Sequence, residues 1–395
     1  MTDPSVSFSN RATRAPAPDV LIVGGGVVGC SIAYHLALAG ASVTLLEREH
    51  LAAGASGVAA GLLAPQVEAP LDDSFFALTL HGKAEHAPLA DALREDVGLD
   101  VEYRETGILR IARTEAERVD LQRRLRWQTA KGLRGEWLEP GDLGKVEPLL
   151  GGVAGRMLSG GALLPDEGQV RSPRLVQALA AASVKRGARI AEGTWATNFE
   201  LRGEQVIGVR TPTGTLAAGT TVLAAGVWSA DLARAAALDL PIGPVKGQIL
   251  TLRALHRVPR QVIWAGDCYL VPKVDGQLIL GATEEDGNYE RRPTLAGVGH
   301  LTEAALEYLP WAGALTVEGV WAGLRPATPD RYPIVGRAPG LANLVLATAH
   351  FRNGILLGPL TGRWVTRLIR EGSEGPEFAG LGPERFLGGS HSVES

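Results

Sequence analysis

The chain has 395 residues, of which 45% are apolar and 21% are charged, and its formal net charge is −4. This length exceeds what one hydrophobic core usually fills, so two domains are expected. The ordinary composition excludes a largely disordered chain, and the small negative charge without a basic cluster excludes nucleic acid and an anionic membrane surface as partners. No apolar stretch reaches the roughly 18 residues of a membrane span.

The first predicted elements are a strand, a glycine-rich turn, a helix and a second strand. Val20–Val23 is a β-branched apolar run suited to a buried parallel strand, and Ser31–Leu38 has the pattern of the helix that follows. Gly40 is placed to end that helix, and Ser42–Leu46 is the expected second strand, which leads directly to Glu47.

Three glycines in the first turn form a GxGxxG motif. Gly24 suits a tight turn, Gly26 lets the backbone approach a pyrophosphate, and Gly29 lets the helix pack on the strand. The start of the helix offers free N–H groups to phosphate oxygens. Because Glu47 is spaced to accept hydrogen bonds from the ribose hydroxyls of an adenosine, the segment predicts a dinucleotide-binding site.

The rest of the chain alternates between α/β segments and two blocks of a different character. Residues 52–65 form a small-residue loop without a predicted helix or strand, and the turn 224–229 contains Ala225 and Gly226, where the backbone can approach a ligand closely. Helices are predicted at Ser74–Val97, Glu115–Lys131, Ser172–Arg186 with Ser172 as N-cap, and from Asn353 or Gly354 to about Arg370; strands are predicted at 221–223, 248–252, 269–271, 277–280 and 344–348.

This order predicts an α/β fold in which a Rossmann-like nucleotide-binding domain is interleaved with a substrate domain built on an antiparallel or mixed sheet. The nucleotide-binding domain is predicted to comprise residues 19–90, 160–235 and 323–385, and the substrate domain residues 91–159 and 236–322. Residues 1–18 are polar and lack an apolar signal core, so they are interpreted as a disordered tail of a cytoplasmic protein.

Two cysteines, Cys30 and Cys268, are the only ones in the chain. They lie in different segments, so neither a disulfide framework nor a cysteine metal site is predicted. The eight histidines include no pair at the spacing of a helical metal site, so no metal is expected.

Several short motifs, in their order and spacing, resemble the FAD-dependent amine oxidase family, which includes D-amino acid oxidases, sarcosine oxidases and glycine oxidases. The resemblance covers roughly residues 19 to 370 and is greatest to the glycine oxidases of thiamine biosynthesis. The motifs are Ala55–Leu62, Pro244–Gly247, Cys268–Pro272, Gly281–Thr283, Trp321–Pro326 and His350–Leu356. The resemblance implies FAD, rather than a nicotinamide cofactor, along the α/β domain.

The resemblance also implies which residues hold FAD. In chain order they are Val27 and Val28 over the pyrophosphate, Glu47 and Arg48 at the ribose, Ala55, Ser56, Ala60, Gly61 and Leu62 along the pyrophosphate and flavin, Ala196 at the adenine, and His350, Phe351, Arg352, Asn353, Gly354, Ile355 and Leu356 at the pyrimidine end of the flavin. A helix that starts near Asn353 would point its positive end at the negative charge of a reduced flavin. Some sarcosine oxidases attach FAD through a cysteine near the position of Gly323–Arg325; this chain has none there, so noncovalent binding is expected.

Substrate contacts are implied in the same way. Arg325, expected just after a strand, resembles the arginine that binds the substrate carboxylate bidentately, with a surface arginine as the alternative. Arg352 resembles a residue of the same pocket, with a structural salt bridge as the alternative. Tyr269 resembles a tyrosine that lines the substrate pocket of the family, and Trp264 is a weaker candidate for the same wall. The alternative for either aromatic is simple packing in the protein interior. Lys246, beside a turn glycine, is interpreted as solvated, with a contact to the flavin or substrate region as the alternative.

These resemblances predict oxidative deamination of glycine to glyoxylate, ammonia and hydrogen peroxide, with dioxygen as the oxidant and no side chain acting as a general base. Such a reaction would supply thiazole synthesis in the thiamine pathway. Sarcosine, proline or a small D-amino acid could replace glycine as the substrate, because each carries the same carboxylate. The sequence is also compatible with a non-catalytic FAD-binding module and with a nicotinamide-dependent dehydrogenase. Family members are often homotetramers, and the sequence is silent on the oligomeric state of this chain.

Overall fold

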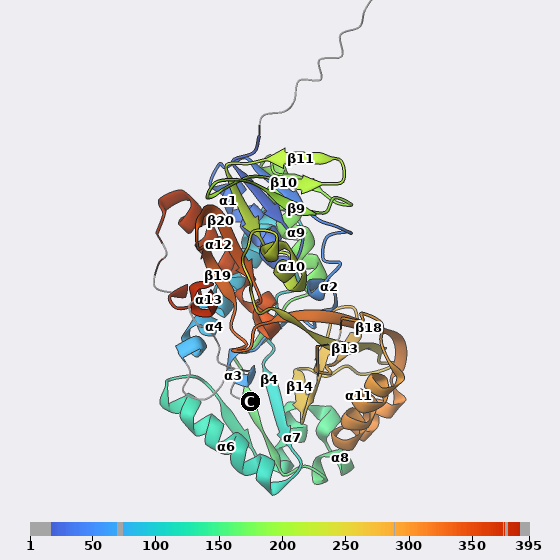
Figure 1. Cartoon of the computed structure of the whole chain (residues 1–395). Coiled ribbons are helices and arrows are strands. Elements are labelled where there is room, and N and C mark those ends of the chain that lie inside the picture. The colour runs from blue at the N-terminus through green and yellow to red at the C-terminus, as the bar shows by residue number, and fades with distance from the viewer. Residues whose placement is uncertain (1–16, 69–73, 288, 374, 376–377, 388–395) are drawn as a thin grey trace, which may run out of the picture.

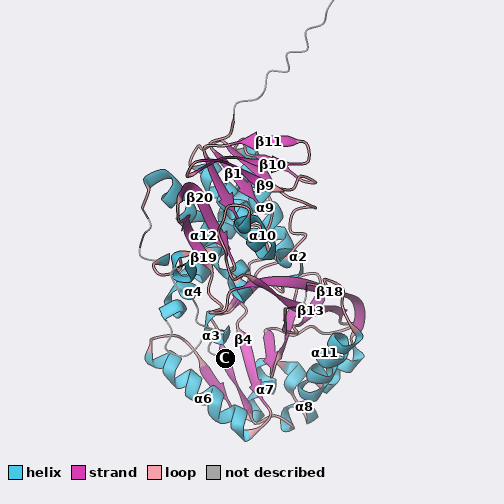
Figure 2. Cartoon of the chain, in the orientation of Figure 1, coloured by secondary structure: helices cyan, strands magenta, loops and turns pink. Residues whose placement is uncertain are grey.

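The computed structural model describes residues 17–68, 74–287, 289–373, 375 and 378–387 (Figure 1). The expected disordered tail falls almost entirely on residues 1–16, outside the described residues. Two large sheets occupy opposite ends of the molecule, and long strands of the second sheet cross the region between them (Figure 2).

A six-stranded sheet contains the first predicted βαβ unit. Its strands are, in spatial order, β19 (Ile334–Ala338), β20 (Leu341–Thr348), β12 (Thr220–Leu223), β1 (Val20–Val23), β2 (Val43–Leu46) and β8 (Arg189–Ala191). Neighbouring strands are parallel except β19, which pairs antiparallel with β20. Parallel strands are buried on both faces: Val20 and Ile22 pack on one side of β1, and Leu21 and Val23 pack on the other. This sheet confirms the Rossmann-like fold.

Different layers cover the two faces of this sheet. The helices that share a core with Val20 and Ile22 are α1 (Val27–Leu38), α4 (Ser74–Ala84), α5 (His86–Val97), α9 (Ser172–Lys185) and α12 (Gly354–Glu371). The opposite face is covered by α10 (Ser229–Arg234) and by an antiparallel sheet of β9 (Asn198–Arg202), β10 (Gln205–Thr211) and β11 (Gly214–Ala217).

The second large sheet has nine strands and is mixed, as predicted. Along its main path the order is β17 (Glu285–Asp286), β13 (Gly243–Arg253), β16 (Gln277–Gly281), β15 (Cys268–Pro272), β14 (Val262–Ala265), β4 (Ile108–Ala112), β6 (Gly160–Leu164) and β5 (Glu136–Leu138), while β18 (Thr316–Ala327) pairs with β13. Only β14 and β4 are parallel neighbours among these described strands.

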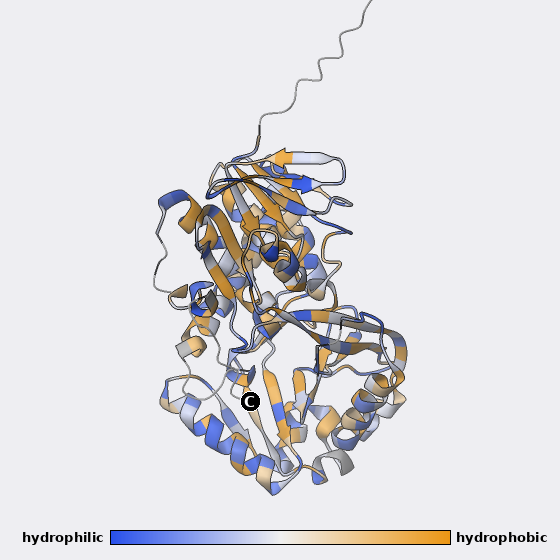
Figure 3. Ribbon diagram, viewed as in Figure 1, coloured by the Kyte–Doolittle hydropathy of each residue, from blue (hydrophilic) through white to orange (hydrophobic). Residues whose placement is uncertain are grey.

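The two faces of the nine-stranded sheet also differ. On one face α7 (Pro140–Val146) and α11 (Leu295–Tyr308) pack against its apolar side chains. On the other face it contacts α6 (Glu115–Ala130) and the segment 60–67 that follows the first βαβ unit. The strands are predominantly apolar and the surface of α6 predominantly polar (Figure 3), as expected where a helix covers a sheet at the surface.

Short elements complete the chain. They are α2 (Ala55–Val58), β3 (Leu62–Leu63), which pairs with β7 (Gly168–Gln169), α3 (Pro65–Glu68), α8 (Val153–Arg156), α13 (Glu384–Leu387), and four 3₁₀ turns at Pro148–Leu150, Gly226–Trp228, Pro310–Ala314 and Phe351–Asn353. Across the described ranges, no helix is long and apolar enough to span a bilayer.

Some local predictions were wrong. The helix expected at 74–97 is divided at Glu85 into α4 and α5, because Pro88 has no N–H to donate to the carbonyl four residues earlier. Ser172 is the first residue of α9 and Arg171 is its N-cap; the Ser172 hydroxyl instead donates to the Ala59 carbonyl at 3.1 Å. The loop expected at 52–65 contains α2, the whole of β3 and the first residue of α3.

Arg325 was expected after a strand but lies within β18, because that strand continues to Ala327 in its pairing with β13. The division into two domains at the predicted boundaries remains a proposal. Two strands bear on those boundaries: β6 belongs to the nine-stranded sheet although it starts the predicted segment 160–235, and β18 extends across residues 322 and 323.

Candidate active site

A cavity of about 460 Å³ lies between the two large sheets. One end of it is lined by residues at the carboxyl ends of β1, β2, β12 and β20, where open α/β sheets bind their ligands. The other end reaches Tyr269 on β15 and Arg325 on β18. The cavity volume is within the roughly 300–1,000 Å³ of small-molecule sites, and it connects a nucleotide-type sheet to the second sheet.

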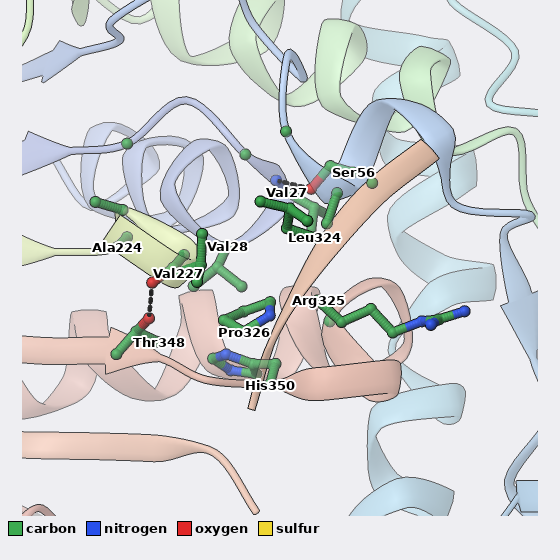
Figure 4. Close-up of a pocket in the computed structure, with 18 of the residues that line it drawn as sticks. Val27, Val28, Ser56, Ala224, Val227, Leu324, Arg325, Pro326, Thr348 and His350 are labelled. Atoms are coloured by element: carbon green, nitrogen blue, oxygen red, sulfur yellow. Dashed lines mark hydrogen bonds between the residues drawn. The ribbon is translucent and has the colours of Figure 1, made fainter. Parts of the chain in front are cut away.

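The start of α1 faces this cavity. The Val27 N–H donates to Ser56 Oγ at 3.1 Å, which fixes the small-residue loop against the helix start (Figure 4). A Cβ atom on Gly24 would lie 2.3 Å from the Ala224 carbonyl oxygen, so only glycine fits this turn. Gly29 does not line the cavity; a Cβ there would lie 1.9 Å from the Gly24 carbonyl, so its role is the close packing of α1 on the turn.

Glu47 and Arg48 lie where the second strand ends. The Glu47 carboxylate accepts hydrogen bonds from the Gly25 and Glu49 N–H groups, each at 2.8 Å, and is thereby held at the cavity wall. The Arg48 guanidinium lies 4.4 Å from the centre of the Trp228 ring, a cation–π geometry. Trp228 also lines the cavity, and the sequence signal for it was its place in the small-residue turn after β12.

A buried lysine holds the small-residue loop against the second sheet. Lys273 Nζ donates to the Ala60 carbonyl at 2.7 Å, to Gln169 Oε1 at 2.8 Å and to the Val170 carbonyl at 3.1 Å. Burial lowers the pKa of Lys273 to about 7. Gly61, the next residue of the loop, has a φ of +80°, and a Cβ there would lie 1.9 Å from the Val170 carbonyl oxygen. Sequence reasoning missed Lys273.

The segment between β20 and α12 has unusual backbone conformations. Ala349 and Phe351 have φ values of 57° and 48°, which are costly for residues other than glycine and concentrate at functional sites. The helix α12 begins at Gly354 beside the cavity, so its positive end faces the cavity. Between them, His350 is buried with Nε2 3.0 Å from Thr361 Oγ1, and burial lowers its pKa to about 4.

The far end of the cavity contains Arg325. Its side chain extends from β18 away from Ala224 and Thr348 (Figure 4). A Cβ on Gly247 of the neighbouring strand would lie 2.5 Å from the guanidinium nitrogens, so the glycine leaves room for this side chain. Arg325 Nη1 donates to the Thr283 carbonyl at 3.0 Å. Burial lowers the pKa of Arg325, although an arginine remains charged in proteins.

Tyr269 forms the wall beside Arg325. It is 8% exposed and lines the cavity, and its burial raises the pKa of the phenol, so the hydroxyl remains protonated. Trp264 packs against it with ring centroids 5.2 Å apart. Trp264 itself is not among the residues that line the cavity, so its contribution is to support Tyr269.

Arg352 lies at the same end but is paired with two carboxylates. Its Nη2 is 3.2 Å from Glu68 Oε1 and its Nη1 is 3.4 Å from Glu284 Oε2. The negative charge of Glu68 raises the pKa of Arg352. Arg352 and Glu68 both line the cavity. Sequence reasoning named a salt bridge as the alternative for Arg352 but did not identify Glu68 as its partner.

Most of the predicted contact residues meet at this one cavity. Those that line it are Gly24, Gly26, Val27, Val28, Glu47, Arg48, Ala55, Ser56, Ala60, Gly61, Leu62, Ala196, Ala225, Gly226, Tyr269, Arg325, His350, Phe351, Arg352, Gly354 and Ile355. Asn353 and Leu356 do not line it: Asn353 is the N-cap of α12, and Leu356 is buried in the core beneath that helix. Their assigned contacts therefore remain a prediction without support from the cavity.

Lys246 was expected to be solvated, and this prediction was wrong. Its side chain is fully buried, and Nζ lies 3.6 Å from Oε2 of Glu285 on the neighbouring strand β17. Both Cys30 and Cys268 are buried and neither lines the cavity. Within the part of the chain that the structure describes, no cluster of three or more His, Cys, Asp or Glu side chains could hold a metal ion.

The residues present fit an FAD molecule. A carboxylate, a helix start and tight glycine turns lie at the end nearest the six-stranded sheet, and a small-residue loop, a helix N-terminus, and an aromatic and a guanidinium group lie at the other. The first set matches an adenosine and a pyrophosphate, and the second matches a flavin with an anionic substrate beside it. This fold and cavity define a flavoprotein oxidoreductase.

Comparison with known proteins identifies the family. Residues 19–368 match the FAD dependent oxidoreductase family, so the chain belongs to it. The chain is 36% identical to a glycine oxidase of Geobacillus kaustophilus over 372 aligned residues. This alignment covers 94% of this chain and 97% of the relative. The crystal structure of glycine oxidase from Geobacillus kaustophilus superposes with a TM-score of 0.88 and covers 94% of this chain and 99% of that one.

Two other relatives extend the comparison. The bifunctional protein ThiO/ThiG of Trichormus variabilis is 35% identical and covers 93% of this chain, which in turn spans 55% of that longer protein. The crystal structure of iminodiacetate oxidase from Chelativorans sp. BNC1 has a TM-score of 0.84 at 26% identity and covers 92% of this chain and 98% of that one. The family match and these relatives show that the chain is an FAD-dependent amino acid oxidase.

Proposed function

We propose that the protein oxidises glycine with dioxygen to glyoxylate, ammonia and hydrogen peroxide. The observation that carries this proposal is Arg325, which lies at the cavity end and, among the described residues, forms no ion pair. A guanidinium group without a carboxylate partner in a partly buried site favours an anionic ligand, and its planar shape binds a carboxylate bidentately. The glycine oxidase relatives support the same choice.

The residues around Arg325 would orient such a substrate. With its carboxylate on Arg325, an amino acid is bounded by Tyr269 and by Ile249 of β13, both cavity-lining and buried. The raised pKa of Tyr269 leaves a neutral hydroxyl that donates a hydrogen bond to the carboxylate without acting as a base. The FAD held by this cavity would supply the hydride acceptor for the substrate Cα–H, and water would hydrolyse the resulting imine to glyoxylate and ammonia.

Among the described residues at this end of the cavity, none is suited to be a strong base. Glu68 and Glu284 are both paired with Arg352, and the pKa of His350 is lowered to about 4 while its Nε2 contacts Thr361. The proposal therefore requires an amine that binds in its neutral form. The start of α12 would stabilise negative charge at the flavin end of the cavity.

The test is a peroxide assay with glycine, sarcosine, D-alanine, D-proline and D-phenylalanine at equal concentration. We expect peroxide from glycine with stoichiometric glyoxylate and ammonia, and overlapping activity with sarcosine, since one methylene changes binding by only about 1–3 kcal/mol. If glycine gives no peroxide while D-phenylalanine reduces the flavin rapidly, the glycine assignment is wrong and the family assignment stands. Substrate-dependent bleaching of the flavin under nitrogen would exclude a non-catalytic FAD-binding protein.

We further propose that the product imine of glycine supplies thiazole synthesis for thiamine, supported by the likeness to a protein named ThiO/ThiG. Deletion of the gene should then cause a growth requirement for thiamine or its thiazole.

We also propose that FAD is held noncovalently, because the two cysteines, Cys30 and Cys268, are buried away from the cavity. Acid denaturation should release free FAD, and flavin that remains with the polypeptide would contradict this.

A further inference from the structure

We propose that Glu68 and Glu284 are specificity-determining residues that keep a second carboxylate out of the substrate pocket. They do so by holding Arg352 in ion pairs, which leaves Arg325 as the guanidinium group available to a substrate. This inference rests on the proposed function, because it concerns which amino acids the same pocket accepts. It predicts that the protein prefers monocarboxylic amino acids over dicarboxylic ones of equal size.

Three separate elements bring these charges together. Glu68 is the last residue of α3, Glu284 lies between β16 and β17, and Arg352 belongs to the 3₁₀ turn before α12. The Glu68 side chain is 17% exposed and that of Arg352 is 33% exposed, so the Glu68–Arg352 pair is partly shielded from water. The two carboxylates bind different nitrogens of the guanidinium, Nη2 and Nη1, at 3.2 Å and 3.4 Å. Arg352 is therefore paired at both ends.

A further arginine, Arg331, pairs with the carboxylates around Arg352, so these carboxylates already have partners other than Arg325. Arg331 Nη1 lies 4.0 Å from Glu284 Oε1, and Arg331 Nη2 lies 3.0 Å from Asp286 Oδ1. The described side chains of this cluster are thus three arginines, counting Arg325, and three carboxylates. A bound monocarboxylate uses the charge of Arg325. A second carboxylate on the substrate would add negative charge with no described guanidinium left unpaired, which like-charge repulsion in a partly buried site opposes.

Displacing one of the native partners does not relieve this repulsion. If a second substrate carboxylate took Arg352 from Glu68, it would leave Glu68 as a partly buried charge without its partner, which is strongly unfavourable. Neutralising Glu68 removes both the excess negative charge and the cost of leaving Glu68 unpaired, because the freed end of Arg352 can then pair with the second carboxylate of the substrate. Neutralising Glu284, which is 40% exposed, should act in the same direction with a smaller effect because water screens it more.

The experiment uses isosteric pairs that differ only in the second carboxylate. The FAD-loaded protein is titrated with malonate and with its monoamide, malonamate, and the dissociation constants are read from the flavin absorbance. The same comparison is made for the rate of anaerobic flavin reduction by D-aspartate and D-asparagine. For the native protein we expect the monoamide to bind at least tenfold more tightly, which corresponds to about 1.4 kcal/mol. This preference should weaken as salt concentration rises.

Glu68→Gln should reduce the preference for the monoamide about tenfold or more, and Glu284→Gln should reduce it by less. The control is Asp91→Asn in α5, which removes one negative charge from an exposed side chain paired only locally with Arg94; it should leave the preference unchanged. A native protein that binds malonate as tightly as malonamate, or a preference that survives both glutamine variants, would overturn the proposal.

This outcome is separable from that of the proposed function. If glycine gives no peroxide but malonamate is still preferred over malonate, the substrate assignment fails and the exclusion of a second carboxylate stands. If neither ligand perturbs the flavin at any concentration, the role of Arg325 as the carboxylate site fails, and the present proposal fails with it. Should Glu68→Gln not retain FAD, Glu284→Gln and the salt dependence of the native protein still decide the question.

Discussion

Arg325 and Arg352 carry the same charge near the same cavity, but their surroundings give them different roles. Arg352 has carboxylates at both ends, whereas the hydrogen bond that Arg325 donates goes to the uncharged carbonyl of Thr283. A neutral acceptor leaves most of the electrostatic attraction of a guanidinium available to a ligand. In the proposed function, the partner of each arginine, rather than its position alone, would decide which of them binds the substrate.

Replacing Arg325 with alanine should abolish most turnover while FAD remains bound. Loss of one member of a buried charge pair costs roughly 2–5 kcal/mol, and about 1.4 kcal/mol is tenfold, so kcat/KM should fall by about thirtyfold or more. Arg325→Lys should recover part of the loss, because it keeps the charge but not the bidentate geometry. Steady-state kinetics and the flavin content measure the two effects. The matched control is Arg234→Ala, an exposed arginine of α10.

A value of kcat/KM for Arg325→Ala within threefold of the parent would contradict this role. So would a variant that has lost its flavin, because the side chain extends away from the nucleotide end of the cavity.

At this scale the sequence predicted residues whose role is set by local pattern and missed those whose role is set by distant partners. Gly24 and Glu47 belong to one βαβ motif, and their geometry follows from spacing alone. Lys246 is fully buried beside Glu285 of β17, which is distant in sequence, and Glu68 pairs with a residue 284 positions away. No local pattern contains such contacts.

At the scale of elements, the small-residue loop depends on one lysine of the other sheet. Replacing Lys273 with methionine keeps a similar length and removes three hydrogen bonds, to the carbonyls of Ala60 and Val170 and to the side chain of Gln169. Each buried acceptor left unpaired costs about 1–3 kcal/mol. We expect faster FAD release and a lower melting temperature of the holoprotein, measured by the recovery of FAD fluorescence and by thermal unfolding.

The control for this prediction is Lys145→Met, since Lys145 is 78% exposed and contacts only a nearby aspartate. If Lys273→Met released FAD as slowly as the control, the lysine would have no part in holding the loop.

A second inter-element contact joins the two parts of the molecule at the nucleotide end. Arg291, beyond β17, lies 5.8 Å from the Trp228 ring and 3.1 Å from Glu49 Oε1, and both partners line the cavity. Arg291→Ala should speed FAD dissociation severalfold, because exposed cation–π and ion pairs each contribute up to about 1 kcal/mol. Stopped-flow fluorescence against excess apoprotein measures the rate.

The neighbouring Arg292 is the control, because its ion pair is with Glu290 of the same segment. Equal rates for Arg291→Ala and Arg292→Ala would show that the contact with Trp228 does not retain the cofactor.

The elements themselves differ in how far the sequence determined them. The strand Val20–Val23 was predicted at its observed bounds, because β-branched residues and flanking glycines specify it locally. The pairing of β18 with β13, and the parallel pairing of β14 with β4, join segments that no periodic pattern links. The mixed sheet was therefore predicted as a class but not as an order of strands.

At the scale of the whole molecule, buried titratable groups set the response to pH. Burial lowers the pKa of His35, His86 and His350 to about 4, below the ordinary value of 6.5. The unfolded chain therefore binds more protons than the folded protein between about pH 4 and 6.5, and the free energy of unfolding falls as the pH falls through this range. Burial raises the pKa of Glu167 to about 8, which opposes the trend.

The two kinds of group predict opposite effects of substitution on the acid side. Each buried histidine contributes up to about 1.4 kcal/mol per pH unit between pH 4 and 6.5, so His350→Asn should flatten the dependence of stability on pH. Above about pH 4.5 the Glu167 carboxyl is still protonated in the folded protein but ionised in the unfolded chain, which opposes the effect of the histidines. Glu167→Gln removes this opposing contribution, so the variant should depend more steeply on pH. Thermal unfolding of the FAD-saturated proteins from pH 4.5 to 6.5 measures both slopes. Parallel curves for the two variants would mean that these buried groups do not set the pH response.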